Sequence, residues 1–233
     1  MGGARRPAVD VFPRAWSNGP RNRLRRSGED PAVSSEIAFV GDVHGNRPAL
    51  SGLWRALVRR ETSHVIFLGD YINKGSQSAG VMQDLIAHRR AGRASLLAGN
   101  HELALLDAID RQDLSGFLKM GGAMTVKSYV GRRVGPDVFA DFIAAFPPEH
   151  LAELRAMRTA YETDELIAEH IPSNSPTAKF HISAHIPVGE LPRIGSRTAR
   201  VDTGCGTDSG RLTALLWPSL DYMQVNSQGE VVP

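Results

Sequence analysis

Apolar residues recur along the chain in short runs that each end at a glycine and a polar side chain. Three such runs, at 37–40, 65–68 and 94–98, precede the sequences GDVHG, GD and GNHE. Short, mostly apolar runs are typical of buried strands in an α/β sheet. A glycine directly after each run allows the sharp turn that the chain needs there. We therefore predict three neighbouring strands whose ends bring polar residues together.

Between these runs, apolar residues repeat at the spacing of amphipathic helices. Such stripes follow the three strands at 50–58, 81–86 and 103–109. Pro48 suits the first turn of the first helix, and Asn46 suits its N-cap. The alternation of strand and helix predicts a parallel sheet with right-handed crossovers.

The second half of the chain departs from this alternation. Two further helical stripes, at 138–146 and 151–157, are separated by Pro147-Pro148. Short strands are expected at 159–162, 165–169, 180–184, 198–202 and 211–217. We expect these five strands to form a second, mixed sheet packed on the first.

Composition and charge restrict the classes of protein that fit. The 233 residues are 42% hydrophobic and 22% charged, as in one soluble globular domain. The lone Cys205 fits a reducing, cytoplasmic compartment, and no apolar stretch approaches the length of a membrane span. Seven arginines and three acidic residues give residues 1–34 a net charge of +4, which leaves −2 for the remainder. The body of the chain is therefore not a basic nucleic-acid binder.

The basic segment at 1–34 is rich in Gly, Pro, Arg and Asn and has neither helical nor strand periodicity. We predict a disordered extension there, followed by a single domain at 35–233. Its arginines could contact nucleic acid or an acidic membrane surface. A solvated extension is the simpler interpretation, so we expect neither a membrane nor a nucleic acid as partner.

The three polar strand ends also carry a family resemblance. GDVHG at 41–45, GDYINKG at 69–75 and GNHE at 99–102 resemble the signatures GDxHG, GDxVDRG and GNHE. These signatures belong to the phosphoprotein phosphatase (PPP) branch of the calcineurin-like metallophosphoesterases. Three signatures in the family's order, each one strand–helix–strand unit from the next, are far more specific than one alone.

Later segments extend this resemblance toward the bacterial type of the family. Residues 121–129 resemble the GGxxTxxSY stretch of many bacterial members, 182–188 the family's GHTPV, and 201–215 its closing DTG…LTAL. The resemblance covers roughly 36–217. It implies an α/β fold of two mixed β-sheets flanked by helices, the αββα sandwich of metallophosphoesterases.

The resemblance implies two divalent metal ions at the strand ends. Carboxylates, imidazoles and an amide carbonyl suit Mn²⁺ as the first expectation, with Fe or Zn also possible. By resemblance, Asp42, His44 and Asp70 hold the first ion, Asp70 bridges, and Asn100 and two later histidines complete the second. Two such ions bind phosphate oxygens and activate a water for attack on phosphorus.

The two later histidines must be chosen from four candidates. By resemblance we predict His170, where the family has HAG or HGG after a strand, and His185, within AHIPV. His181 lies an even number of strand positions before His185, so we expect a packing or surface role. His150 follows two prolines at a helix start, so we expect an exposed side chain.

His101 follows Asn100 and has no metal-binding role in the family. The resemblance implies that it acts as a general acid or stabilises the leaving oxygen. The family orients it with the second Asp of GDxVDRG, where this chain has Asn73, followed by Lys74 in place of Arg. An amide cannot stabilise an imidazolium as a carboxylate does, and a lysine lacks the two-pronged donor geometry of an arginine.

The interval between His170 and His185 is short. The family places a second phosphate-binding arginine there, but in this chain Lys179 is the only cation of the interval. We expect a metallophosphoesterase that hydrolyses phosphomonoesters, with a phosphorylated protein as the first choice of substrate and a small phosphoester as another. A dinucleoside polyphosphate hydrolase and a weakened relative that binds metal and phosphate without turnover remain open alternatives.

Overall fold

The computed structural model describes residues 23–24, 36–131, 134–173 and 178–233. The predicted disordered extension at 1–34 therefore lies outside the described residues, apart from a two-residue strand, β1 (Arg23–Leu24). Within the described part of the chain, no helix is both long and apolar enough to cross a membrane.

One six-stranded sheet carries the three strands that precede the polar signatures. β2 (Ile37–Val40), β3 (His64–Phe67) and β4 (Ala94–Leu96) are parallel neighbours, as predicted. On the other side of β2, three strands continue the sheet with antiparallel pairing. They are β10 (Leu212–Trp217), β11 (Tyr222–Val225) and β12 (Val231–Val232).

The position of β10 corrects the prediction that the strand at 211–217 belongs to the second sheet. β10 pairs with β2, so that Ala214 lies opposite Val40. Both faces of β10 are buried: Leu216 packs toward the helices and Leu215 toward the other sheet. A strand that is apolar on both faces fits either sheet, so its pattern could not decide between them.

The second sheet is mixed, as predicted, and contains six strands in the order β1-β5-β6-β7-β9-β8. The β6–β7 and β7–β9 pairs are parallel, and the β5–β6 and β8–β9 pairs are antiparallel. These strands are β5 (Ala160–Glu162), β6 (Leu166–Glu169), β7 (Phe180–Ser183), β8 (Arg193–Ile194) and β9 (Thr198–Arg200).

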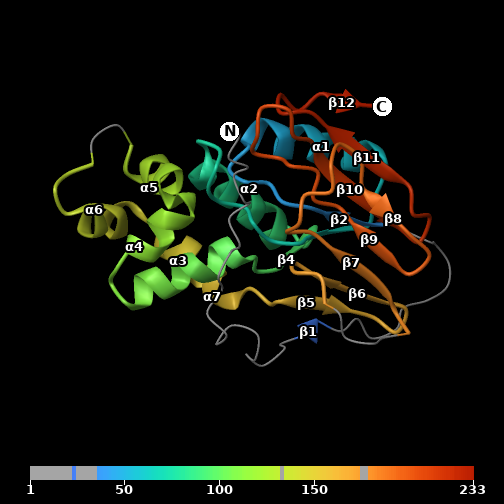
Figure 1. The fold of residues 1–233 in the computed structure, drawn as a ribbon, viewed down its shortest axis with the longest axis horizontal. Helices are drawn as coiled ribbons and strands as arrows, with labels where there is room; N and C mark the ends of the chain where they lie inside the picture. The colour runs from blue at the N-terminus through green and yellow to red at the C-terminus, as the bar shows by residue number, and fades with distance from the viewer. Residues whose placement is uncertain (1–22, 25–35, 132–133, 174–177) are drawn as a thin grey trace, which may run out of the picture.

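The two sheets and the helices that cover the first of them form layers (Figure 1). Two apolar cores hold these layers together. One lies between the two sheets, where Phe39, Ile66 and Leu215 meet Ile182 and Val201. The other lies between the first sheet and its helices, α1 (Arg47–Arg59) and α2 (Ser78–Arg90). Asn46 caps α1 and Pro48 lies in its first turn, as predicted. The expected fold class, two mixed sheets with flanking helices, is confirmed.

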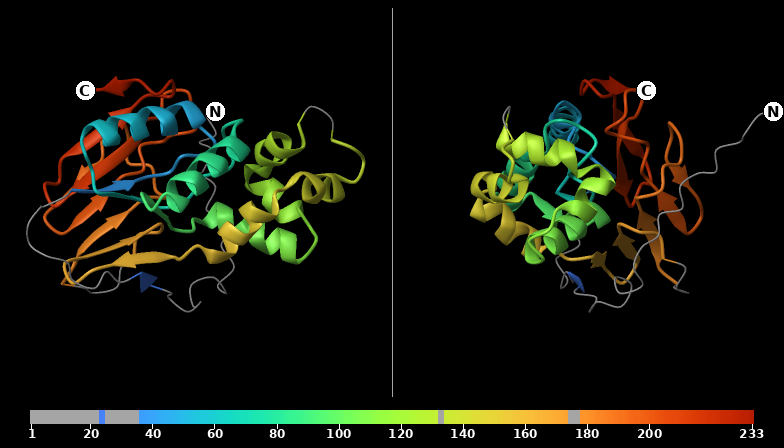
Figure 2. Two further views of the ribbon diagram at one scale, coloured as in Figure 1. Left: turned by 180° about the vertical axis from the view of Figure 1, so that it is seen from behind. Right: turned by 60° about the vertical axis from the view of Figure 1, so that its left-hand side comes forward.

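Further helices gather beside the sheets, at one end of the molecule (Figure 2). The segment connects β4 to β5 and packs around buried aromatic side chains such as Phe117 and Phe142. It comprises α3 (Asn100–Asp110), α4 (Ser115–Phe117), the π-helix η2 (Leu118–Gly122), α5 (Ala123–Val130), α6 (Val138–Ala145) and α7 (Pro148–Ala156).

His150, on α7, was predicted to be exposed, and that prediction is wrong. Its side chain is buried, with Nδ1 2.8 Å from the Tyr129 hydroxyl and Nε2 3.2 Å from the Gln83 amide oxygen. Its partners come from α5 and α2, which are distant in sequence. The two prolines indicate where α7 begins but carry no information about what packs against it.

Candidate metal centre

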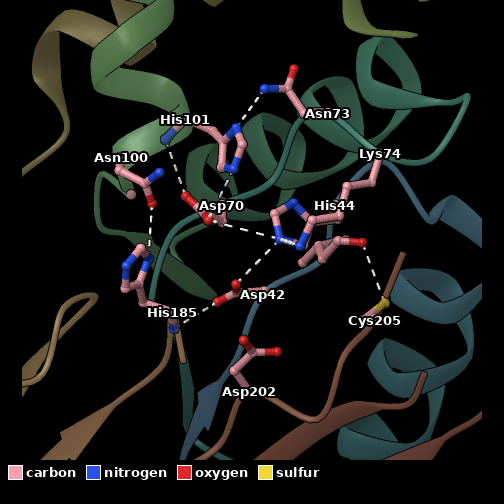
Figure 3. A network of polar contacts seen from close by, with 12 residues as sticks. Asp42, His44, Asp70, Asn73, Lys74, Asn100, His101, His185, Asp202 and Cys205 are labelled. Carbon is pink, nitrogen blue, oxygen red and sulfur yellow. Dashed lines mark hydrogen bonds and ion pairs between the residues drawn. The ribbon is translucent and has the colours of Figure 1, made fainter. Parts of the chain in front are cut away.

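The polar signatures converge because β2, β3 and β4 are adjacent and parallel (Figure 3). Asp42 and His44 follow β2, Asp70 follows β3, and Asn100 begins α3 after β4. Gly69 is required between β3 and Asp70. Its φ is +109°, and a Cβ there would lie 2.4 Å from the backbone nitrogen of Gly99.

Several residues at these strand ends have left-handed backbone conformations. Positive φ values occur at His44 (45°), Asp70 (55°), Asn73 (70°), Lys74 (56°) and His185 (66°). Each such residue costs about 1–3 kcal/mol unless its surroundings hold it there, and such residues cluster at functional sites. Their concentration on the predicted site residues is a reason, independent of the motifs, to place function here.

The first predicted ligand group is brought together around His44. Its Nε2 lies 3.3 Å from Asp42 Oδ2 and 3.8 Å from Asp70 Oδ2. Its Nδ1 lies 3.1 Å from the carbonyl oxygen of Ile72. A proton on Nδ1 donated to that carbonyl leaves Nε2 unprotonated, as a metal ligand requires.

The second predicted ligand group surrounds the side-chain amide of Asn100. Its Oδ1 lies 2.9 Å from His170 Nε2 and 3.0 Å from His185 Nδ1. His170 Nε2 is also 3.2 Å from Asp70 Oδ1. Asp70 thus belongs to both groups, and the ligand atoms of Asp70, His170 and His185 all lie within 4.8 Å of one another.

The donor set of the second group fits a divalent cation. The same Asn100 atom is 3.1 and 3.2 Å from the two carboxylate oxygens of Asp70. An amide oxygen in that place is favoured by positive charge between it and the carboxylate, which a divalent cation or a proton on His170 can supply. With the amide turned, its nitrogen would face the same four atoms and donate to them, which requires His170 Nε2 to be unprotonated.

The pKa values of His170 and Asp70 also indicate that this group favours a positive charge. Burial disfavours charge on His170, but the neighbouring Asp70 carboxylate outweighs burial and raises the His170 pKa to about 9. Burial opposes charge on Asp70 too, yet His170 holds the Asp70 pKa well below its usual range. A proton on His170 therefore occupies the place that a bound cation would take, and metal binding would release it.

The His101 ring faces the other carboxylate oxygen of Asp70 from the one that His170 approaches. Its Nε2 is 3.7 Å from Asp70 Oδ2, and its Nδ1 is 2.5 Å from the amide nitrogen of Asn73. Thr125 Oγ1 donates to the amide oxygen of Asn73 over 2.6 Å, which turns the amide nitrogen toward His101. Nδ1 thus accepts and Nε2 carries the proton. Burial lowers the His101 pKa to about 4, so the ring is neutral at pH 7.

Lys74 is the cation nearest to the first ligand group. Its Nζ lies 2.6 Å from His44 Nε2, the predicted ligand atom. Lys179, by contrast, donates to Glu162 over 3.0 Å and precedes β7, at the opposite end of that strand from His185. Lys179 therefore does not replace the missing arginine. His181 is buried within β7 and belongs to neither ligand group.

Glu102 is a site residue to which sequence reasoning gave no role. Its fully buried carboxylate accepts from the backbone N–H groups of Gly99 (2.9 Å), Asp70 (2.8 Å) and Tyr71 (2.9 Å). It thereby ties the loop after β3 to the start of α3. Burial, with Asp70 nearby, raises its pKa to about 7. A glutamate at the third position of a helix that begins with GN is a capping signal and could have indicated this role.

Asp202, from the DTG segment, is the other charged residue without a predicted role. It is buried beside Asp42 (Figure 3), and one of its oxygens accepts from the Gly204 backbone N–H over 2.9 Å. Burial and the neighbouring Asp42 raise its pKa to about 6.

The family of the chain follows from comparison with known proteins. The family model described as calcineurin-like phosphoesterase matches residues 35–214. The chain belongs to the calcineurin-like phosphoesterase family. Members of this family are metallophosphoesterases that use divalent metal ions, in agreement with the two ligand groups that share Asp70. The matched range contains every predicted ligand and ends within β10.

Solved structures share the metallophosphoesterase fold. A protein assigned as a diadenosine tetraphosphatase matches with a TM-score of 0.63 at 18% identity, over 88% of this chain and 97% of that one. A cold-active protein-tyrosine phosphatase from a Shewanella species matches with a TM-score of 0.52 at 15% identity, over 85% of this chain and 80% of that one. At these identities the likeness establishes the fold alone.

A curated relative shares part of the sequence. The zinc-dependent endopolyphosphatase of Saccharomyces cerevisiae is 32% identical over 95 residues, which are 40% of this chain and 28% of that protein. Because the match spans so little of the relative, its activity does not transfer to this chain directly.

Proposed function

We propose that this metallophosphoesterase is of the PPP type and hydrolyses phosphomonoesters with two divalent ions. The observation that carries the proposal is the position of Asp70, whose carboxylate adjoins both ligand groups. When bound, two such ions supply positive charge for the phosphate oxygens and lower the pKa of a nucleophilic water. Mn²⁺ is our first choice, because mixed carboxylate and imidazole ligands suit it.

The residues of the chain divide the work between binding and catalysis. Asp42, His44 and Asp70 would hold one ion. Asp70, Asn100, His170 and His185 would hold the other. The neutral Asn100 leaves more positive charge at the second ion than a third carboxylate would, which favours an anionic substrate.

His101 would contact the leaving group of the substrate. With the proton on Nε2 and the Asn73 amide on Nδ1, His101 offers a hydrogen bond to the leaving oxygen. Full proton transfer would leave an imidazolate, which an amide cannot stabilise. Lys74 neutralises one phosphate oxygen as a point charge, without the two-pronged geometry of an arginine.

Phosphorylated protein side chains are our first candidate substrate, and dinucleoside polyphosphates are the second. The contact between Asn73 and His101 favours the second candidate. A phosphoanhydride leaves as a stable phosphate and needs little proton donation, whereas a serine alkoxide needs much.

One assay series tests the reaction and separates the substrates. The purified chain is loaded with Mn²⁺, its metal content is measured, and hydrolysis of p-nitrophenyl phosphate, a phosphopeptide and diadenosine tetraphosphate is compared. We expect metal-dependent turnover of p-nitrophenyl phosphate that Asp70→Ala abolishes. Two bound metals without turnover of any substrate would instead support a relative that binds metal and phosphate only.

A further inference from the structure

The second sheet has an outer face, on the side away from the first sheet. Among the described residues, the two helices that pack on a sheet, α1 and α2, contact strands β4 and β10–β12 of the first sheet. Figures 1 and 2 show these helices on the far side of the first sheet from the second. Parallel strands such as β6, β7 and β9 normally have both faces covered. The outer face of these strands therefore calls for a covering layer.

The alternation of side chains along each strand identifies the residues of this outer face. Ala168, Ile182 and Ala199 belong to the core between the two sheets, so their neighbours along each strand point outward. The strand register arranges the outward residues in two rows that cross the sheet. One row is Glu162, Ile167, His181 and Thr198, and the other is Ala160, Glu169, Ser183 and Arg200.

The middle of this face is buried. Ile167 is 7% exposed and His181 is 8% exposed, and Ala160 and Ser183 are also buried. Ala160 and Ile167 belong to neither of the two apolar cores. The Nε2 atom of His181 is buried without a hydrogen-bond partner among the described residues. Burial of outward side chains indicates that another part of the molecule lies over them.

The short strand β1 indicates which part of the chain is in place to do this. β1 pairs with β5, and Arg23 lies opposite Ala160, in line with the second outward row. Residues 1–22 therefore join the domain at the edge of this sheet. At about 3.3 Å per residue, 22 residues can extend about 70 Å. The distance from β5 to β9 is three strand spacings, or about 15 Å.

We propose that residues 1–22 fold back over the outer face of the second sheet and cover Ile167 and His181. The segment contains Val11, Phe12 and Trp16, whose apolar side chains can pack on Ile167. Because β1 holds the segment beside the sheet, its effective concentration there is in the millimolar range, and weak contacts suffice for docking. Part of the predicted disordered extension would then be ordered against the domain.

The charges of the face favour the same segment. The half of the face nearest β1 carries the carboxylates of Glu162, which also binds Lys179, and Glu169. The far half carries the guanidinium of Arg200. Residues 1–22 contain four arginines and one aspartate, so they suit the half that adjoins β1.

This cover would support the strands that position the second ligand group. His170 directly follows β6, and His185 lies two residues beyond β7. The inference does not depend on the proposed function, because it concerns the packing of the sheet and requires neither metal nor turnover.

Chemical modification of His181 tests the proposal on the full chain. Diethyl pyrocarbonate modifies accessible imidazoles, and mass spectrometry of peptides gives the rate for each histidine. The triple variant Val11→Asp, Phe12→Asp, Trp16→Asp should release the segment without altering the domain. The triple variant Ser27→Asp, Ser34→Asp, Ser35→Asp adds the same charge outside residues 1–22 and is the matched control. His88, on α2, serves as the internal reference.

We expect His181 to react about tenfold faster in the first variant, relative to His88, and at the wild-type rate in the control. Deletion of residues 2–20 should have the same effect as the first variant. A peptide of residues 1–22, added to the shortened chain, should slow the reaction again. An unchanged His181 rate in the first variant, or an equal acceleration of His88, would overturn the proposal. A wild-type His181 rate that falls as the protein concentration rises would assign the face to a second copy of the chain instead.

Discussion

The two sides of Asp70 differ in how closely they follow the family. On the ligand side, Asn100, His170 and His185 stand where the resemblance places them and lie within 3.2 Å of one another. On the other side, His101 meets the Asn73 amide nitrogen where the family has a carboxylate. Under the proposed function, the binding of phosphate and the hydrogen bond to its leaving group therefore depend on different sides of Asp70. The ligand side predicts binding, and the altered side limits which substrates can react.

The largest expected effect comes from removing the residue that both sides share. Asp70→Ala should abolish binding of both metal ions, because one carboxylate adjoins both ligand groups. Metal analysis after dialysis should fall from two ions per chain to none. Asp208→Ala, an exposed carboxylate outside both groups, is the control. An unchanged content of two ions would refute the bridging assignment.

A second effect concerns Glu102, which holds the two sides in register. In the wild type, backbone N–H groups donate to the Glu102 carboxylate. In Glu102→Gln, an amide N–H₂ group replaces one of the accepting oxygens and faces these donors. Leaving such buried donors unpaired costs about 1–3 kcal/mol. Urea unfolding should report this loss in the free energy of unfolding. Glu149→Gln breaks an exposed ion pair with Arg90 and should change it by less than about 1 kcal/mol. Equal effects of the two variants would contradict this role of Glu102.

The sequence could predict the parts of this site that depend on local pattern. Strands β2, β3 and β4 follow from apolar runs before glycines, and their parallel order brings Asp42, Asp70 and Asn100 together. Asn46 and Pro48 mark the start of α1 for equally local reasons. A motif can be recognised from its own residues and from the strand that precedes it.

What could not be predicted depends on partners that are distant in sequence. His150 is buried because Tyr129 and Gln83 come from other helices. Glu102 accepts from backbone groups that no side-chain pattern reveals. The same limit applies to β10, whose apolar residues suit both sheets.

Restoring the family's residues at positions 73 and 74 should have an intermediate effect, which we expect in turnover. Asn73→Asp with Lys74→Arg gives His101 a carboxylate that can balance an imidazolium. General acid assistance is worth about 10²–10⁴-fold, and we expect about tenfold because no second arginine is restored. Turnover of a phosphoserine peptide should rise more than that of p-nitrophenyl phosphate, whose leaving group needs little help. No gain on either substrate, with two metals still bound, would favour the non-catalytic alternative.

The smallest expected effect concerns Asp202, whose raised pKa should make the stability of the fold depend on pH. Burial and Asp42 raise the pKa of Asp202 to about 6, above its ordinary value of 3.8. A raised carboxyl pKa means that the folded state holds a proton that the unfolded state releases. Stability is therefore lost as pH rises from about 4 to about 6. Asp202→Asn removes this loss, so the metal-free variant should be more stable than wild type at pH 7.5.

The new amide nitrogen replaces an oxygen that has no partner among the described residues, and this unpaired donor costs stability. The cost offsets part of the gain that follows from the pKa shift, so we expect a net gain of about 1 kcal/mol at pH 7.5. Unfolding of EDTA-treated protein should therefore find the variant less stable than wild type at pH 4, where only the cost of the amide remains, and more stable at pH 7.5. Asp221→Asn, at the surface beside Arg60, should not produce this pH dependence. Adding Mn²⁺ should reduce or reverse the gain, because nearby cations favour a charged Asp202. A gain that persists at pH 4, or that Mn²⁺ leaves unchanged, would mean that the ligand side is not the electronegative site described here.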